Sequence, residues 1–320
     1  MKCIKKVIAS AVAGLVFSGA VLAGEVKEVR LDYATYSPTS LAVKKIGMME
    51  EEFKKDDIAV KWVFSQGSAN ALDFLKKGSL DFGSTAGLAA VLARANGTPV
   101  KGVYIFSKPE WAALVVGKDS TITSVKQLKG KKIAATPGTD PYLFTLRTLE
   151  LNGMHKSDVE MVSMPHVLGR KALENKEVDA WAALDPHKSA SVLEAGSKVL
   201  YRNPDFCTYG FLNTTDDFAK AHPEIVKRVL HVYEKGRAWV KAHPDDAAQL
   251  MSEEAKISLT VAKAQLKLND FSNSVPGAEQ IKALKAAASL LADEKLVSSA
   301  AAANDAVDKL VDGSLAKGLK

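Results

Sequence analysis

The sequence has few cysteines and only one long apolar run, and both shortages exclude classes of protein. Two of its 320 residues are cysteine, Cys3 and Cys207, too few for a disulfide framework or a thiolate metal cluster. Beyond residue 23, no apolar run approaches the roughly 20 residues that a membrane-spanning helix needs. With 47% hydrophobic and 25% charged residues, the rest of the chain has the composition of a soluble globular protein.

The one long apolar run lies at the N-terminus. Lys2, Lys5 and Lys6 precede it, and Val21-Leu22-Ala23 ends it with small residues at the positions where signal peptides are cut. We therefore expect residues 1–23 to be a cleaved signal peptide and the mature protein to be periplasmic. Cys3 lies inside this leader, so it cannot become a lipid-anchored N-terminus.

The mature chain carries little net charge. Removing residues 1–23 takes away three lysines and no acidic residue, so the formal charge falls from +6 to +3. A nucleic-acid-binding function loses its main support, and we expect no nucleic-acid partner.

The sequence also lacks the short motifs of common catalytic sites. It contains no GxSxG, P-loop, GxGxxG or HExxH motif, and its six histidines are scattered. No two acidic residues stand out by position as an acid/base couple. We therefore expect a protein that is not an enzyme and has no cofactor and no metal site.

Strand-like and helix-like segments alternate along most of the chain. The predicted strands are residues 28–33, 58–64, 80–82, 100–106, 112–117, 132–135, 159–163, 178–182, 198–201 and 209–212. After residue 222 the pattern is mostly helical. The alternation predicts βαβ units and parallel sheets, with ligand loops at the carboxyl ends of the strands. A chain of this length favours two lobes.

Two stretches of the sequence have the same order of elements. DFLKKGSLDFGSTAG (residues 73–87) and ALENKEVDAWAALDP (172–186) each run from a helix through a polar turn into a strand, at Leu80-Asp81 and Val178-Asp179. This predicts two related lobes that face each other. The alternative is a chance similarity between common α/β patterns.

Four predicted strand-to-helix turns, near residues 36, 66, 84 and 138, carry small or hydroxyl residues. A helix N-terminus has unpaired N–H groups and a partial positive charge, so such turns suit an anion or another polar ligand. Their commoner role is simply to cap the helix. Because all four lie on one predicted face, we favour a binding site.

In this order, FSQGSANALDFLKKGSLDFGSTAG (64–87), VKQLKGKKIAATPGT (125–139) and ENKEVDAWAALDP (174–186) resemble periplasmic binding proteins of ABC importers. The group that this sequence resembles most binds aliphatic sulfonates, taurine and nitrate, and includes relatives that bind pyrimidines. The resemblance covers residues 27–312. It implies an α/β, two-lobed periplasmic binding protein fold (type II) with two crossing strands and a helical C-terminal tail on lobe one. Lobe one would comprise residues 24–112 and 211–320, and lobe two residues 113–210.

The resemblance also implies that the ligand binds at turns in the cleft between the lobes. The candidate ligand-binding residues are Tyr36, Ser37, Gln66, Gly67, Ser68, Ser84, Thr85, Ala86, Gly138, Thr139, Asp140, Trp181 and Asp185. The family often has WAxWDP where this chain has Trp181-Ala-Ala-Leu184-Asp185-Pro186, so one aromatic residue is absent and the ligand stays open. Asp185 has two interpretations, a helix cap or a contact with an ammonium or amide group of the ligand.

The function that the resemblance implies is capture of a small oxyanion-bearing solute. We expect an aliphatic sulfonate or taurine, delivered by a monomeric protein to the membrane subunits of an ABC importer. Closure would occur about the crossing strands near residues 112 and 210. A nitrate-like anion or a pyrimidine-type heterocycle is the alternative ligand, and a periplasmic enzyme on the same fold is the alternative function.

Overall fold

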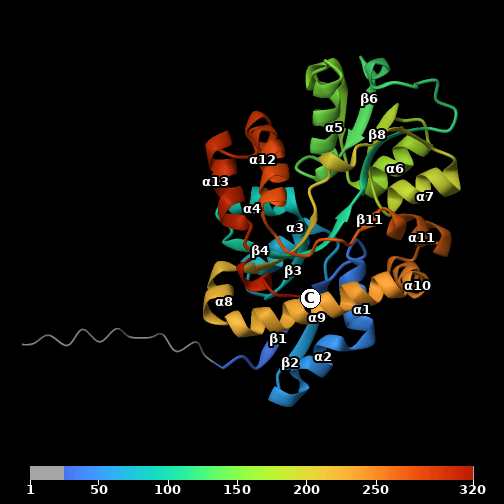
Figure 1. Cartoon of the computed structure of the whole chain (residues 1–320). Helices are drawn as coiled ribbons and strands as arrows, with labels where there is room; N and C mark the ends of the chain where they lie inside the picture. Colours follow the sequence, from blue (N-terminus) through green and yellow to red (C-terminus); the bar gives the residue numbers. More distant parts are fainter. Residues whose placement is uncertain (1–24, 320) are drawn as a thin grey trace, which may run out of the picture.

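The computed structural model describes residues 25–319, so the predicted signal peptide lies outside the described residues. These residues form an α/β fold of two lobes, each built on a β-sheet with helices packed around it (Figure 1). Lobe one contains both ends of the described chain, and lobe two, in green and yellow, is inserted between them.

The strands of lobe one form a two-stranded sheet, β1-β2, and a four-stranded sheet, β3-β10-β4-β11, which one parallel bridge joins into the order β2-β1-β3-β10-β4-β11. These strands are β1 (Glu28–Tyr33), β2 (Ala59–Phe64), β3 (Gly83–Ala86), β4 (Val100–Pro109), β10 (Gly210–Thr215) and β11 (Asn269–Asp270). β1 and β2 are parallel, and a parallel bridge from Leu31 to Phe82 links them to the strands around β10. β10 is antiparallel to both β3 and β4.

The sheet of lobe two has the order β7-β6-β8-β5-β9. Its strands are β5 (Ala112–Val116), β6 (Lys132–Ala135), β7 (Glu160–Ser163), β8 (Ala180–Leu184) and β9 (Lys198–Tyr201). β6 is parallel to β7 and β8, whereas β5 is antiparallel to β8 and β9. Both sheets are therefore mixed, and the prediction of parallel sheets is wrong for the crossing strands β5 and β10.

The two sheets have the same topology. In each lobe the order is second, first, third, crossing and fourth strand. The crossing strand, β10 in lobe one and β5 in lobe two, is the one that the chain forms directly after it arrives from the other lobe. Asp81 and Asp179 occupy matching places: their carboxylates accept hydrogen bonds from Arg30 N at 2.8 Å and Lys132 N at 2.9 Å. Their backbone N–H groups donate back to the carbonyl oxygens of Arg30 and Lys132. The two similar stretches of sequence thus reflect two related lobes, as predicted.

One strand begins later than predicted. The third strand is β3, at Gly83–Ala86, whereas the sequence pattern favoured residues 80–82. Ser84, Thr85 and Ala86 therefore lie within a buried strand that pairs with β10, and not in a turn.

Helices pack around both sheets. Lobe one has α1 (Pro38–Ile46), α2 (Met48–Phe53), α3 (Ser68–Lys76) and α4 (Gly87–Ala95), and lobe two has α5 (Asp140–Leu151), α6 (His166–Glu174) and α7 (His187–Ala195). The short 3-10 helices are η1 (Lys54–Asp56), η2 (Val125–Leu128), η3 (Lys156–Asp158), η4 (Pro204–Phe206) and η5 (Ser314–Ala316). At this level the predicted alternation of helices and strands is confirmed.

A helical tail completes lobe one, as the fold prediction required. It contains α8 (Asp216–Ala221), α9 (Pro223–Ala242), α10 (Pro244–Ala255), α11 (Leu259–Lys267), α12 (Ala278–Asp293) and α13 (Ala300–Leu310). The long helix α9 starts with a proline at its first position and buries Val226, Val229, Leu230 and Tyr233 on one face. It packs against α1, while α13 packs against α4. Within residues 25–319, no helix combines the length and the apolarity needed to cross a membrane.

The lobes also touch away from the crossing strands. Helix α5 of lobe two packs against α12 of lobe one, and α7 packs against α11 (Figure 1). Apolar side chains of α4, α5 and α12 form one buried cluster that spans both lobes. The two lobes therefore share buried contacts beyond the crossing segments.

Candidate functional site

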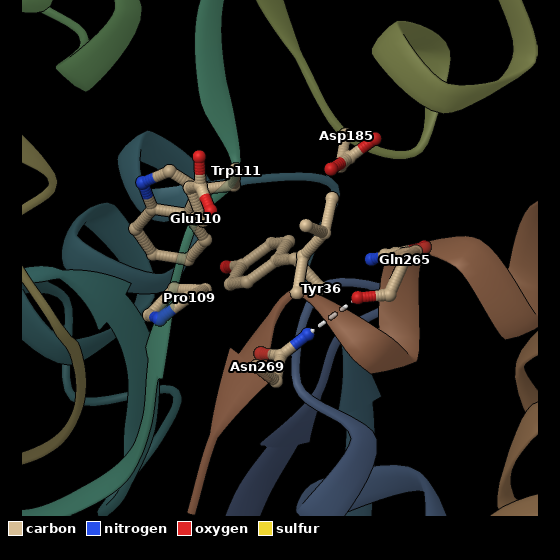
Figure 2. A pocket seen from close by; sticks show the side chains of 8 residues that line it. Tyr36, Pro109, Glu110, Trp111, Asp185, Gln265 and Asn269 are labelled. Carbon is tan, nitrogen blue, oxygen red and sulfur yellow. Dashed lines mark hydrogen bonds between the residues drawn. The ribbon is translucent and has the colours of Figure 1, made fainter. Parts of the chain in front are cut away.

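A small cavity lies between the lobes, beside the point where the chain passes from β4 to β5 (Figure 2). It is lined by Tyr36, Pro109, Glu110, Trp111, Asp185, Gln265, Leu268 and Asn269. Tyr36 stands in the middle of the labelled side chains, with Asp185 above it and Asn269 below it (Figure 2). The volume is about 10 Å³, room for roughly one water molecule.

Tyr36 links this cavity to the strand ends of lobe one. Its hydroxyl donates a hydrogen bond to the Ser84 carbonyl oxygen at 2.8 Å, and its ring meets Trp111 edge-on with centroids 6.3 Å apart. Burial, together with the charge of Asp32, raises the pKa of Tyr36 well above its usual value. The phenol therefore stays neutral at physiological pH and presents its ring to the cavity.

Asp185 is a buried carboxylate that already has partners. Its Oδ1 atom accepts hydrogen bonds from the Ser189 backbone at 2.9 Å and the Ser189 hydroxyl at 2.6 Å. The Lys188 ammonium lies 2.9 Å from Oδ2 and donates to the Glu110 carbonyl oxygen at 2.6 Å. Asp185 thus stabilises the first turn of α7, which agrees with the capping interpretation; a contact with a ligand stays a prediction.

Asp140 ties lobe two to both crossing segments. It is buried at the start of α5, where its carboxylate accepts from the Trp111 indole N–H at 3.0 Å. It also accepts from the Thr208 hydroxyl at 2.6 Å and the Thr208 backbone N–H at 3.2 Å. Trp111 lies in the first segment that crosses between the lobes and Thr208 in the second. Asp140 therefore ties the start of α5 to both crossing segments.

The donors at the start of α4, expected to be available to a ligand, are occupied by the protein itself. Gly87 N donates to the Thr208 and Tyr209 carbonyl oxygens, and Leu88 N donates to the Thr208 hydroxyl at 3.1 Å. Ser84 N donates to Asp32 Oδ1 at 2.8 Å. This helix start is therefore capped by the second crossing segment.

The remaining predicted site residues fall into two groups. Gln66 is exposed, and Gly67, Ser68, Gly138 and Thr139 are half-buried at the starts of α3 and α5. Buried within the protein are Ser37, which caps α1, Thr85, Ala86 and Trp181. The Trp181 ring packs inside lobe two against Gly169 of α6, away from the cavity that Tyr36 and Asp185 line.

Thr85 has a structural partner inside lobe one. Its hydroxyl oxygen accepts a hydrogen bond from the Asn213 side chain on β10 at 2.8 Å. We expect Thr85→Val to lower the free energy of unfolding by about 1 kcal/mol, because one buried hydrogen bond is lost. Ligand affinity should not change. Urea unfolding followed by circular dichroism measures the effect, and the exposed Thr260→Val serves as the control. A loss of affinity without a loss of stability would contradict this assignment.

Sequence reasoning missed several residues at the site. Gln265 and Asn269 reach the cavity from α11 and β11, more than 200 residues from Tyr36, so no local pattern marks them. Lys188 carried a signal, because it lies three residues after Asp185 at helical spacing. Among residues 25–319, no group of three or more His, Cys, Asp or Glu side chains is placed to hold a metal ion.

A hollow next to the cavity carries side chains of both charges, and its Arg202 is paired with Glu110. This hollow of about 330 Å³ is lined by Lys108, Arg202 and Lys267, together with Glu110 and Asp270.

In lobe two, His166 at the start of α6 lies 3.4 Å from the Thr136 hydroxyl. Burial and the nearby His187 lower the pKa of His166 to about 4, so its imidazole is neutral at pH 7.

Comparison with known proteins agrees with this geometry. Residues 50–247, more than half of the chain, match the family described as NMT1/THI5 like. The protein of Bacillus subtilis (strain 168) named "Putative aliphatic sulfonates-binding protein" is 29% identical over 287 residues, which cover 89% of this chain and 86% of that protein.

Two solved structures share the fold. The periplasmic aliphatic sulphonate binding protein SsuA from Escherichia coli superposes with a TM-score of 0.82 at 23% identity, over 90% of this chain and 92% of that one. The alkanesulfonate-binding protein SsuA from Xanthomonas axonopodis pv. citri, bound to MOPS, gives 0.79 at 23% identity, over 89% and 99%. The chain therefore belongs to the NMT1/THI5-like family and has the two-lobed fold of the periplasmic binding proteins.

Proposed function

We propose that this chain is an exported solute-binding protein that captures an aliphatic sulfonate or taurine and delivers it to the membrane subunits of an ABC importer. The observation that carries the proposal is the cavity at which Tyr36 of lobe one meets Asp185 of lobe two. The relatives named for sulfonate binding support the choice of ligand. The leader-like residues 1–23 support export to the periplasm.

Capture would depend on a hinge motion of the lobes. A cavity of about 10 Å³ has no room for a sulfonate, so the lobes must move apart to admit one. We place the hinge at the two crossings, near Glu110-Trp111 and Cys207-Thr208-Tyr209, with lobe two comprising residues 113–210. The protein would act as a monomer, since a hinge within one chain suffices for closure.

The ligand would be held mainly by neutral donors. The Ser68 hydroxyl and the backbone N–H groups of Ser68, Gly138 and Thr139 lie at helix starts that are half-buried, whereas the Thr139 hydroxyl donates to the Thr136 carbonyl oxygen at 2.7 Å. Each hydrogen bond to a charged ligand contributes roughly 1.5–3 kcal/mol. Lys108 and Lys267 would attract the anion toward the cleft before it binds, whereas the charge of Arg202 is balanced by Glu110.

Calorimetric titration with ethanesulfonate, taurine, nitrate and uracil tests the ligand class. We expect binding of a sulfonate and weak or no binding of uracil. Binding of nitrate or uracil alone would replace the sulfonate assignment. Mass spectrometry of the ligand after long incubation tests the enzymatic alternative, because chemical conversion of the ligand would contradict a pure binding function.

The cavity makes a specific prediction for Tyr36. We expect Tyr36→Ala to weaken ethanesulfonate binding by at least about tenfold, equal to 1.4 kcal/mol, because the ring forms the wall between the lobes. Trp181→Phe is the matched control, since this aromatic residue lies outside the cavity and should keep its affinity. Titration calorimetry measures both variants. Equal affinities for Tyr36→Ala and the wild type would place the ligand elsewhere.

A further inference from the structure

A group of buried polar side chains lies behind Tyr36, at the carboxyl ends of the first three strands. It consists of Asp32 on β1, Ser65 after β2, Ser84 on β3 and Tyr233 on α9, and all four are fully buried. Asp32 Oδ1 accepts a hydrogen bond from Ser84 N at 2.8 Å. Within residues 25–319, Asp32 Oδ2 and the hydroxyls of the other three side chains make no hydrogen bond of normal geometry, although the Ser65 and Ser84 hydroxyls lie near enough to Asp32 to favour its charged form.

This carboxyl group differs from the other buried carboxyl groups of the site. Asp185 is paired with Lys188, and Asp140 accepts three hydrogen bonds from Trp111 and Thr208. Burying an ionised carboxylate without a cation costs free energy, so burial favours the protonated, neutral form of Asp32. Burial raises the pKa of Asp32 to about 7, although the hydroxyls of Ser84 and Ser65 act in the opposite direction.

The groups that face Asp32 from the surrounding elements are hydroxyls rather than charges. Ser65, Ser84 and Tyr233 come from β2, β3 and α9, and Tyr36 lies just before α1. The charged side chains adjacent on the same elements are paired elsewhere: Arg30 on β1 with Asp81, and Glu234 on α9 with Arg237. A proton on Asp32 is therefore the simplest way to balance its charge.

Asp32 is connected to the interlobe cavity through two hydrogen bonds. The Tyr36 hydroxyl donates to the Ser84 carbonyl oxygen, and Ser84 N donates to Asp32. The charge of Asp32 acts on the Tyr36 phenol, whose ring lines the cavity. Because Asp32 is fully buried, its charge is poorly screened by solvent, and an ionised Asp32 would repel a negative charge in the cavity.

We propose that Asp32 is a specificity-determining residue, which sets the net charge of the ligand that the cleft accepts. With Asp32 protonated the cleft accepts a plain anion; with Asp32 ionised it disfavours the anion relative to a zwitterion. Binding of a plain anion thus takes up a proton at Asp32. The inference rests on the function proposed above.

The sign of the pH dependence follows from this linkage. An anion in the cavity raises the pKa of Asp32 further, so affinity is greatest below the pKa of the ligand-free protein and falls as the pH rises through it. Ethanesulfonate keeps its charge across this range, so any pH dependence of its affinity must arise from a group of the protein that takes up a proton from solvent. Its Kd should rise between about pH 6 and about pH 8, by at most about tenfold per pH unit. Taurine, which carries no net charge at these pH values, should change by less.

Calorimetry of ethanesulfonate and taurine at several pH values, with the wild type and three variants, tests the proposal. Asp32→Asn should make ethanesulfonate affinity independent of pH. Ser65→Ala removes a hydroxyl that favours the charged form of Asp32, so the fall in ethanesulfonate affinity should move to higher pH. Loss of a proton from His166 or His187 would also weaken anion binding as the pH rises, so these histidines are the rival source of the pH dependence. The double variant His166→Gln/His187→Gln should keep the dependence if Asp32 is its source.

The outcomes separate this inference from the proposed function. Sulfonate binding whose affinity does not change with pH would overturn the role of Asp32 and leave the function intact. A pH dependence that persists in Asp32→Asn, or that vanishes in the double histidine variant, would likewise overturn the role of Asp32 and leave the proposed function intact. Absence of sulfonate binding at every pH would overturn both. A carbon-13 NMR titration of the ligand-free protein gives an independent readout, and a midpoint for Asp32 near that of an exposed aspartate would also refute the proposal.

Discussion

The Asp140→Ala variant should unfold with a free energy about 3–5 kcal/mol below that of the wild type. The reason is that the carboxylate accepts hydrogen bonds from Trp111 and from both donors of Thr208. Alanine leaves the indole N–H and the Thr208 N–H buried without acceptors, and each such loss costs about 1–3 kcal/mol. Urea unfolding monitored by tryptophan fluorescence measures the change.

A carboxylate on the surface of lobe two provides the control for Asp140. Asp119 pairs with Lys176, and both side chains are exposed. Asp119→Ala should unfold at the same urea concentration as the wild type, because exposed ion pairs contribute little. If Asp140→Ala matched this control, Asp140 would not hold the crossing segments together.

The Gly87→Ala variant should lose about 2–3 kcal/mol of stability. A Cβ atom at position 87 would lie 2.2 Å from the Thr208 carbonyl oxygen and 2.8 Å from the Phe211 ring. The carbonyl belongs to the backbone of the second crossing segment, so it cannot turn aside as a side chain can. Either α4 or the crossing segment must shift, and the hydrogen bonds from Gly87 N to this segment weaken with it.

Gly277→Ala is the matched control for this prediction. Gly277 lies just before α12, as Gly87 is the first residue of α4; its backbone is extended with φ at −171°, and a Cβ atom at this position would meet no atom within 4 Å. Thermal unfolding of the two variants side by side should show a lower Tm for Gly87→Ala only. Equal Tm values would mean that the crossing segment moves freely relative to α4.

The sequence predicted the elements well and strand direction poorly. The sequence identified β1, β6 and β9 at their observed bounds, because a short run rich in apolar residues marks a strand whatever its neighbours are. Such a run says nothing about the direction of the neighbouring strand, so the antiparallel pairing of β5 and β10 was missed. β3 was misplaced because Gly83-Ser-Thr-Ala86 is typical of a turn, whereas here small residues fit between α3 and β10.

For the candidate site, the sequence predicted segments that a ligand would contact, and this stays a prediction; the bonding of each side chain could not be predicted. Tyr36 and Asp185 meet at one cavity, as residues at facing strand ends can. Thr85 and Asp140 have polar side chains suited to a ligand, yet each is used by a long-range protein contact, with Asn213 and Thr208. Asp32 appeared as one residue of a strand, and only its burial between β1, β3 and α9 shows its chemistry.

The order of the strands along the chain has a consequence for synthesis. The sheet of lobe two is made from residues 112–201 without interruption, so it can form as soon as that stretch is available. In lobe one, β3 and β4 lie on either side of β10, and Gly83 pairs with Asn213. A nascent chain therefore carries the edges of β3 and β4 unpaired until more than a hundred further residues have been added. Such edges are open to pairing with other chains. Lobe one is begun first and completed last. Its open strand edges therefore need protection from pairing with other chains while the chain is still growing.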